Sequence, residues 1–254
     1  MLVTSNLRSK KYSLKELLST QVPLIAASFS DTADDNSLKT AFEDGLDIAE
    51  LRIDQYGSFE IEYILSQVQR FVDFPTIATV RIESQGGNWK GEDQERLDIS
   101  KAVLPYVDCV DIELVSQEIL ADLVTKAKSQ DKLVIISHHD FEATPPIEEL
   151  EQLALQAKDL GADLVKLAVN TNSNDDLRRL SLFTLDKSSL GLIVIAMGQE
   201  GRMSRLCFPA FGSRITYAAI GEPVCGQLSF RQTFDWFREF YPSFNEKKNT
   251  QRVL

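Results

Sequence analysis

The chain has 254 residues, of which 43% are hydrophobic and 26% charged, with a formal net charge of −11 and an isoelectric point near 4.8. This acidic balance argues against a nucleic-acid binder, which needs a basic face, and no apolar run reaches the roughly 18 residues of a membrane span. The N-terminal residues lack the apolar core of a signal peptide, and the three cysteines form no C-x-x-C pair, so we expect a cytoplasmic protein with reduced thiols.

Short apolar runs alternate with amphipathic segments along the whole chain. The runs predict eight strands, at Val22–Ser30, Leu46–Asp54, Thr76–Ile82, Cys109–Leu114, Lys132–Phe141, Asp163–Asn170, Leu192–Gly198 and Ile215–Ile220. Apolar residues at helical spacing predict helices that include Phe59–Phe71, Glu92–Tyr106, Gln117–Ser129, Pro146–Leu160, Asn174–Leu185 and Ser229–Phe240. We expect residues 1–21 to add a small hairpin or cap and residues 245–254 to form a frayed tail.

The alternation of strands and helices decides the predicted fold. It favours βαβ units and a parallel sheet, and eight such units suit a barrel of about 250 residues. We therefore predict a single domain over residues 1–254, a (β/α)8 TIM barrel of the α/β class. An open doubly wound sheet is the alternative, but the chain has neither the Gly-x-Gly-x-x-Gly dinucleotide fingerprint nor a P-loop.

Lys166 stands inside the otherwise apolar run Asp163–Val169. Burial disfavours the ammonium form of a lysine, and a neutral amine can condense with a ketone or an aldehyde. A lysine at a strand end that reaches water is the alternative interpretation.

Further charged side chains follow other predicted strands. Catalytic residues of (β/α)8 barrels come from the carboxyl ends of the strands and the loops after them. The charged positions at these ends include Glu50, Arg52, Asp54, Arg81, Asp111, Glu113, His139 and Lys166, with Arg202 and Arg205 after the seventh strand. Buried charges are costly, so they favour a functional site. An internal ion-pair network that only fixes the barrel is the alternative.

The chain has two histidines, His138 and His139, which are neighbours on a strand and so point to opposite faces. They cannot bind one metal ion together, and zinc usually takes about three or four converging ligands. Asp111, Glu113 and His139 could hold magnesium only with several waters, so we expect no metal. One histidine should face the same barrel mouth as Lys166 and act as acid and base.

The segments Ser137–Pro145 and Ala162–Val169 resemble type I 3-dehydroquinate dehydratase. Further motifs similar to that family are Glu50–Asp54, Arg81 with Gly86-Gly87, Asp111–Glu113, Met197–Ser213 and Gly226-Gln227. The resemblance covers roughly Pro23 to Gln227. It implies a (β/α)8 barrel, usually a homodimer, that needs no metal or organic cofactor. It also implies dehydration of 3-dehydroquinate, a small anionic substrate, to 3-dehydroshikimate in the shikimate pathway.

The resemblance also implies roles for individual residues. Lys166 is the expected Schiff-base nucleophile and His139 the expected acid and base, while Arg205 is expected to bind the substrate carboxylate. The other substrate-binding residues that we expect are Glu50, Arg52, Arg81, Gln227 and Ser28. Two positions depart from the family pattern: Gln85 replaces a glutamate expected near His139, and Pro223 replaces a serine of the closing loop.

Two other functions stay open from the residues. A Schiff-base aldolase would use the same lysine on the same barrel, and often binds phosphate at loops after strands seven and eight, where this chain has Gly198, Gly201, Gly221 and Gly226. A barrel that binds a small anion without catalysis is the second alternative, against which the presence of both Lys166 and His139 weighs.

Overall fold

The computed structural model describes residues 12–20, 22–223 and 226–246, and its centre is a sheet of eight parallel strands. The strands are β1 (Leu24–Phe29), β2 (Ile48–Arg52), β3 (Thr76–Thr79), β4 (Cys109–Glu113), β5 (Leu133–Asp140), β6 (Leu164–Asn170), β7 (Leu192–Met197) and β8 (Ile215–Tyr217). From β1 to β7 each strand pairs with the next one in the chain, and β8 pairs with β1.

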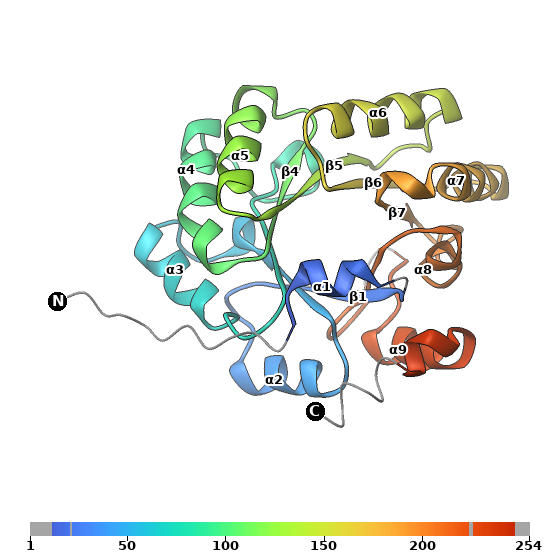
Figure 1. Cartoon of the computed structure of the whole chain (residues 1–254), viewed down its shortest axis with the longest axis horizontal. Coiled ribbons are helices and arrows are strands. Elements are labelled where there is room, and N and C mark those ends of the chain that lie inside the picture. The colour runs from blue at the N-terminus through green and yellow to red at the C-terminus, as the bar shows by residue number, and fades with distance from the viewer. Residues whose placement is uncertain (1–11, 21, 224–225, 247–254) are drawn as a thin grey trace.

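The sheet curls into a nearly closed barrel with the helices around it (Figure 1). At the seam between β7 and β8, the Arg214 amide donates to the Leu192 carbonyl (2.8 Å). The Ser213 hydroxyl accepts from the Val194 amide (3.0 Å). The predicted (β/α)8 barrel is therefore confirmed.

Helices lie between successive strands, and the last helix follows β8. They are α2 (Asp35–Glu43), α3 (Ile61–Gln69), α4 (Asp93–Val103), α5 (Gln117–Ser129), α6 (Ile147–Asp159), α7 (Asn174–Asp186), α8 (Ser204–Cys207) and α9 (Phe230–Phe240), with α1 (Leu14–Ser19) before the first strand. All six helices named from the sequence are present. The last one begins with a capping box, in which Ser229 and Gln232 satisfy each other's backbone amides.

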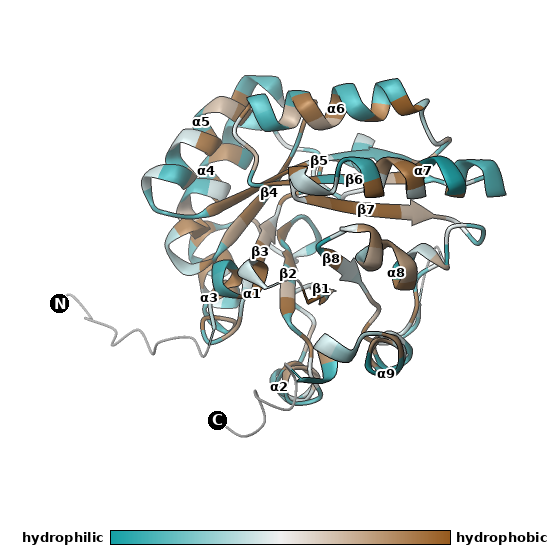
Figure 2. Ribbon diagram, turned by 45° about the vertical axis from the view of Figure 1, so that its right-hand side comes forward, coloured by the Kyte–Doolittle hydropathy of each residue, from teal (hydrophilic) through white to brown (hydrophobic). Residues whose placement is uncertain are grey.

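The alternation of side chains along each strand separates the core into two parts. One set of positions packs against the helices. The other set, on the alternate positions, forms an inner cluster that includes Leu24, Ile48, Ile77, Cys109, Leu133, Leu164, Ile193 and Ile215. In Figure 2, β4 and β7 are drawn mainly in brown, the colour of hydrophobic residues. Leu14 and Leu17 of α1 are buried in this inner cluster, near the strand starts, so the polar interior positions gather at the other end, the carboxyl mouth.

Several boundaries differ from the prediction. The third strand ends at Thr79, so Arg81 lies in the connection to a 3-10 turn, and Asp54 belongs to the turn Ile53–Gln55 rather than to β2. The described part of the N-terminal cap is helix α1, while residues 1–11 and 21 and the tail from 247 lie outside the described residues. Within the described chain, no helix has both the length and the apolarity that crossing a bilayer demands. Cys109 and Cys207 are free thiols, and Cys225 is outside the described residues.

Candidate active site

Lys166 lies on an inward position of β6, opposite Ser137 of β5 in the strand register. The residue is 5% exposed. Its Nζ lies 3.1 Å from Oδ2 of Asp111 and 3.3 Å from Oε1 of Glu50. The two carboxylates therefore hold the Lys166 nitrogen from two sides, which accounts for a charged side chain inside the barrel.

The carboxylates belong to a buried row of alternating charges. The Arg81 guanidinium binds Asp111 (2.8 Å) on the side of Lys166 and Glu113 (3.2 Å) on the other side, and Arg96 of α4 pairs with Glu113. All five side chains are at most 6% exposed. The ion-pair network considered from the sequence does exist, and because Lys166 is one end of it, it also orients the candidate nucleophile.

This network lowers the pKa of both carboxyls beside Lys166. Burial alone would raise the pKa of Asp111, but Arg81 and Lys166 outweigh it and hold that pKa well below its usual range. For Glu50, burial is likewise outweighed, by Lys166 and Arg52, and the pKa is lowered. Both groups are carboxylates at neutral pH, so neither is a proton donor to substrate.

Glu50 accepts hydrogen bonds from four side chains. Ser28 donates to Oε2 (2.5 Å), while Thr79 (3.1 Å), Lys166 (3.3 Å) and Tyr217 (3.4 Å) donate to Oε1. Oε1 therefore receives three of these bonds and Oε2 receives one, from Ser28. Glu50 holds Lys166 in this way, and the expectation that Glu50 and Ser28 bind substrate stays a prediction.

Three further predicted binding residues come from separate parts of the chain: the end of strand β2, helix α8 and the segment after Gly226. Arg52 is fixed by two hydrogen bonds to Asp54, at 2.9 and 2.8 Å. Arg205 stands on the short helix α8 and is 5% exposed. Gln227 follows Gly226, whose positive φ of 75° and close approach to the Gly198 carbonyl exclude a side chain there.

His139 lies one residue before the end of strand β5 and lines the pocket, and the pKa of its imidazole is lowered well below the usual value. Burial is the main cause, and the positive charges of Arg81 and Lys166 add to it, while Asp111 opposes it. Its Nδ1 is buried without a hydrogen-bond partner among the described residues. His139 is therefore a neutral base at neutral pH. His138 is absent from the described residues that line the pocket around Lys166.

Gln85 holds the main chain of His139 rather than its ring. The Gln85 side-chain oxygen accepts from the His139 amide (2.7 Å), and its nitrogen donates to the His139 carbonyl (3.2 Å). A glutamate could make the first contact but not the second, because a carboxylate has no donor. Where the family pattern has a charged carboxylate near the imidazole, this chain therefore has a neutral amide that makes two hydrogen bonds to the main chain of His139.

The Gln85→Glu variant is expected to raise the pKa of His139, because a nearby carboxylate favours imidazolium. His139 is neutral only above its pKa, so the acidic limb of the kcat/KM profile should move to higher pH. Gln85→Met removes the same main-chain contacts without adding charge, and its limb should stay in place. Equal limbs in Gln85→Glu and the parent protein would contradict the argument.

One pocket of about 190 Å³ at the barrel mouth brings all the predicted site residues together. Lys166, His139, Glu50, Arg52, Arg81, Arg205, Gln227 and Ser28 all line it. The pocket is also lined by Gln85, Phe141, Met197 and Tyr217. We did not predict from the sequence that these four residues contact substrate. For Tyr217, the signal was its inward position on the eighth strand, two residues after Ile215.

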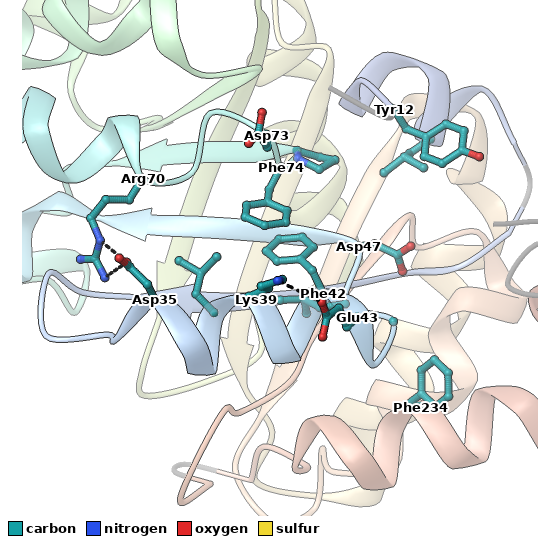
Figure 3. Close-up of a pocket in the computed structure, with 15 residues that line it drawn as sticks. Tyr12, Asp35, Lys39, Phe42, Glu43, Asp47, Arg70, Asp73, Phe74 and Phe234 are labelled. Carbon is teal, nitrogen blue, oxygen red and sulfur yellow. Dashed lines mark hydrogen bonds and ion pairs between the residues drawn. The ribbon is translucent and has the colours of Figure 1, made fainter. Parts of the chain in front are cut away.

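A larger hollow of about 680 Å³ lies outside this mouth (Figure 3). The rings of Phe42 and Phe74 stack within it, 3.9 Å apart. Four of its charged groups form two ion pairs, Arg70 with Asp35 (2.7 Å) and Lys39 with Glu43 (3.7 Å). No histidine lines it. Size alone favours this hollow, but the convergence of an amine, a neutral base and arginines favours the smaller pocket as the reaction site.

A metal centre is not evident among the described residues. Within residues 12–20, 22–223 and 226–246, no group of three or more His, Cys, Asp or Glu side chains is arranged to hold a metal ion. Pro223, the second departure, is exposed, and the two residues after it lie outside the described residues. The expectation of activity without metal stays a prediction.

Comparison with known proteins identifies the relatives of this barrel. The family model described as type I 3-dehydroquinase matches residues 22–239. The 3-dehydroquinate dehydratase of Methanococcoides burtonii is 40% identical over 75% of this chain and 83% of its own length. That of Thermodesulfovibrio yellowstonii is 35% identical over 87% and 97%. The crystal structure of the Aquifex aeolicus 3-dehydroquinate dehydratase superposes with a TM-score of 0.79 at 32% identity, over 86% of this chain and 99% of that one.

Proposed function

The chain belongs to the type I 3-dehydroquinase family, and from this premise we propose that it dehydrates 3-dehydroquinate through a Schiff base on Lys166, with His139 as acid and base. The family makes the protein a hydro-lyase. The observation that carries the mechanism is that the amine of Lys166 and the neutral imidazole of His139 line the same pocket. The two side chains come from adjacent strands, β5 and β6.

The reaction begins at the C3 ketone of the substrate. The Lys166 amine attacks this carbon to give a carbinolamine, and His139 transfers the protons that allow water to leave. The product is a cationic imine, which withdraws electrons from C2 and acidifies its hydrogens. His139 takes one C2 proton, the enamine expels the C1 hydroxyl, and the same imidazolium protonates that leaving group. Hydrolysis then releases 3-dehydroshikimate and the lysine.

The lowered pKa of His139 suits the first half of this sequence. In the free protein the imidazole is neutral and can accept a proton without first losing one. A low pKa also makes it a weak base, and the cationic imine compensates because it makes the C2 hydrogens more acidic. Once protonated, a group of low pKa is a strong acid, which favours proton delivery to the departing hydroxyl.

The substrate carboxylate is proposed to bind Arg205, whose planar fork suits bidentate recognition. Arg205→Lys should raise KM about 10- to 100-fold with a smaller change in kcat, because loss of a charge-assisted hydrogen bond costs about 1.5–3 kcal/mol. Arg178 pairs with Asp175 on the exposed face of α7, and Arg178→Lys is the control that should leave KM unchanged. An unaltered KM in Arg205→Lys would remove this arginine from the binding site.

An absorbance assay tests the proposed reaction directly, because dehydration creates a carbonyl conjugated with a carbon–carbon double bond. Absorbance should grow when 3-dehydroquinate is added, with no shorter carbon chain among the products. An aldolase would instead release two smaller fragments, and a non-catalytic barrel would bind the substrate without turnover.

Turnover is expected to survive exhaustive chelation, because the proposed electron sink is the imine and not a metal ion. The measurement is the same assay before and after removal of divalent ions. Activity that disappears and returns with one added ion would show that a metal takes part.

The family resemblance also leads us to propose a homodimer in the cytoplasm, and sedimentation of the purified protein would test the oligomeric state.

A further inference from the structure

Tyr217 is the third group that surrounds the Lys166 nitrogen. It ends strand β8 on an inward position, beside Ala26 of β1, and is 5% exposed. The Nζ of Lys166 lies over its ring, 4.5 Å from the centroid. Asp111 and Glu50 contact the same nitrogen at hydrogen-bond distances. The amine is therefore held between two carboxylates and the face of an aromatic ring.

Both the ring and the hydroxyl of Tyr217 approach this nitrogen. The phenol oxygen lies 3.5 Å from Nζ and 3.4 Å from Oε1 of Glu50, both at the long limit of a hydrogen bond. The ring centroid, in contrast, is well inside the roughly 6 Å range over which an aromatic face attracts a cation. That attraction grows when the pair is removed from water, as it is here.

We propose that Tyr217 is a positioning residue for Lys166, whose aromatic face holds the nitrogen in place and favours the cationic imine over the neutral carbinolamine. This inference rests on the proposed Schiff base at Lys166. The nitrogen changes from neutral in the carbinolamine to positive in the imine, so a ring that attracts positive charge accelerates the loss of water between them.

The phenol itself does not transfer protons in this proposal. Burial raises the pKa of Tyr217 well above its usual value, and the carboxylates of Glu50 and Asp111 raise it further. The side chain thus stays uncharged, so its ring presents a neutral, electron-rich face to Lys166 at every pH at which the protein is folded and active.

The test replaces Tyr217 by phenylalanine, 4-fluorophenylalanine and 3,4,5-trifluorophenylalanine in the full chain. Fluorine removes electron density from the ring face and nearly preserves its shape, so a cation contact weakens stepwise while packing does not. The readout is the single-turnover rate at which borohydride traps 3-dehydroquinate on Lys166. Tyr217→Phe should stay within about threefold of the parent, and the trifluoro variant should be slower than Tyr217→Phe by about 3- to 30-fold, with KM little changed.

Each other outcome overturns the inference. Equal trapping rates across the three aromatic variants would show that only packing matters. A loss in Tyr217→Phe as large as that in Tyr217→Leu would assign the effect to the hydroxyl. If the parent protein itself forms no adduct at Lys166, the proposed function fails first, so the two failures are distinguishable. Circular dichroism of each variant confirms that it is folded.

Discussion

Replacing Lys166 by arginine is expected to abolish turnover, with a loss on the order of 10⁴–10⁶-fold, because it removes a covalent nucleophile on which the later steps depend. Arginine keeps a positive charge beside Asp111 and Glu50, which are 3.1 and 3.3 Å from the native nitrogen. It stays protonated and cannot form the imine. The measurements are the absorbance assay and mass analysis after borohydride treatment with 3-dehydroquinate, which should label the Lys166 peptide of the parent protein and nothing in the variant.

Two further variants separate chemistry from stability. Lys166→Met should also be inactive, and should lower the free energy of unfolding by about 3–5 kcal/mol, because it leaves buried carboxylates without their cation. Lys158 is the control, because burial lowers the pKa of its amine, but its Nζ binds the carbonyls of Ala162 and Asp163 outside the pocket. Lys158→Met should keep its activity. A label on Lys158, or turnover by Lys166→Arg, would refute the assignment.

The period of two along the strands is the reason the fold and the two central residues could be predicted. A short, buried strand must place alternate side chains in the barrel, so Lys166 and Ala168 point the same way as Leu164. The same rule separates His139 from His138. These are local properties of each strand, and a sequence displays them directly.

The contacts between strands could not be predicted in the same way. Lys166 binds Asp111, 55 residues away, and Glu50, 116 residues away. Only the register of β2, β4 and β6 around the barrel brings these groups to one level. The contacts of Glu50 and Asp111 with Lys166 were therefore not foreseen from the sequence.

Tyr217 and Gln85 were harder to interpret for a different reason. An aromatic residue in an apolar strand is typical of a packed core, and nothing in Ile215–Tyr217 indicates that its ring faces a lysine. Gln85 stood out only by its difference from the family pattern. Its actual contacts are with the backbone of His139, and they depend on the path of the 3-10 turn Glu83–Gln85 as well as on the amide side chain.

His139→Ala is expected to lower kcat by about 10²–10⁴-fold, the usual contribution of general acid–base catalysis. The Schiff base does not need the imidazole as its covalent partner, so this variant should still form some imine and accumulate it. Borohydride should then trap substrate on Lys166 in a protein that turns over slowly. His138→Ala is the control and should cost stability more than rate, because His138 is absent from the described residues that line the pocket. Burial lowers the pKa of His138, and Asp140 and Glu149 oppose that effect.

The pH profile gives an independent check on His139. Proton abstraction needs the neutral imidazole, which exists above its pKa, and this pKa lies well below the usual imidazole value of 6.5. The acidic limb of kcat/KM for the parent protein should therefore lie below pH 6.5, and His139→Ala should lack it while His138→Ala retains it. Only the residue that titrates in the acidic limb can be the base. A limb that persists in His139→Ala, or disappears in His138→Ala, would therefore assign the proton transfers to a group other than His139.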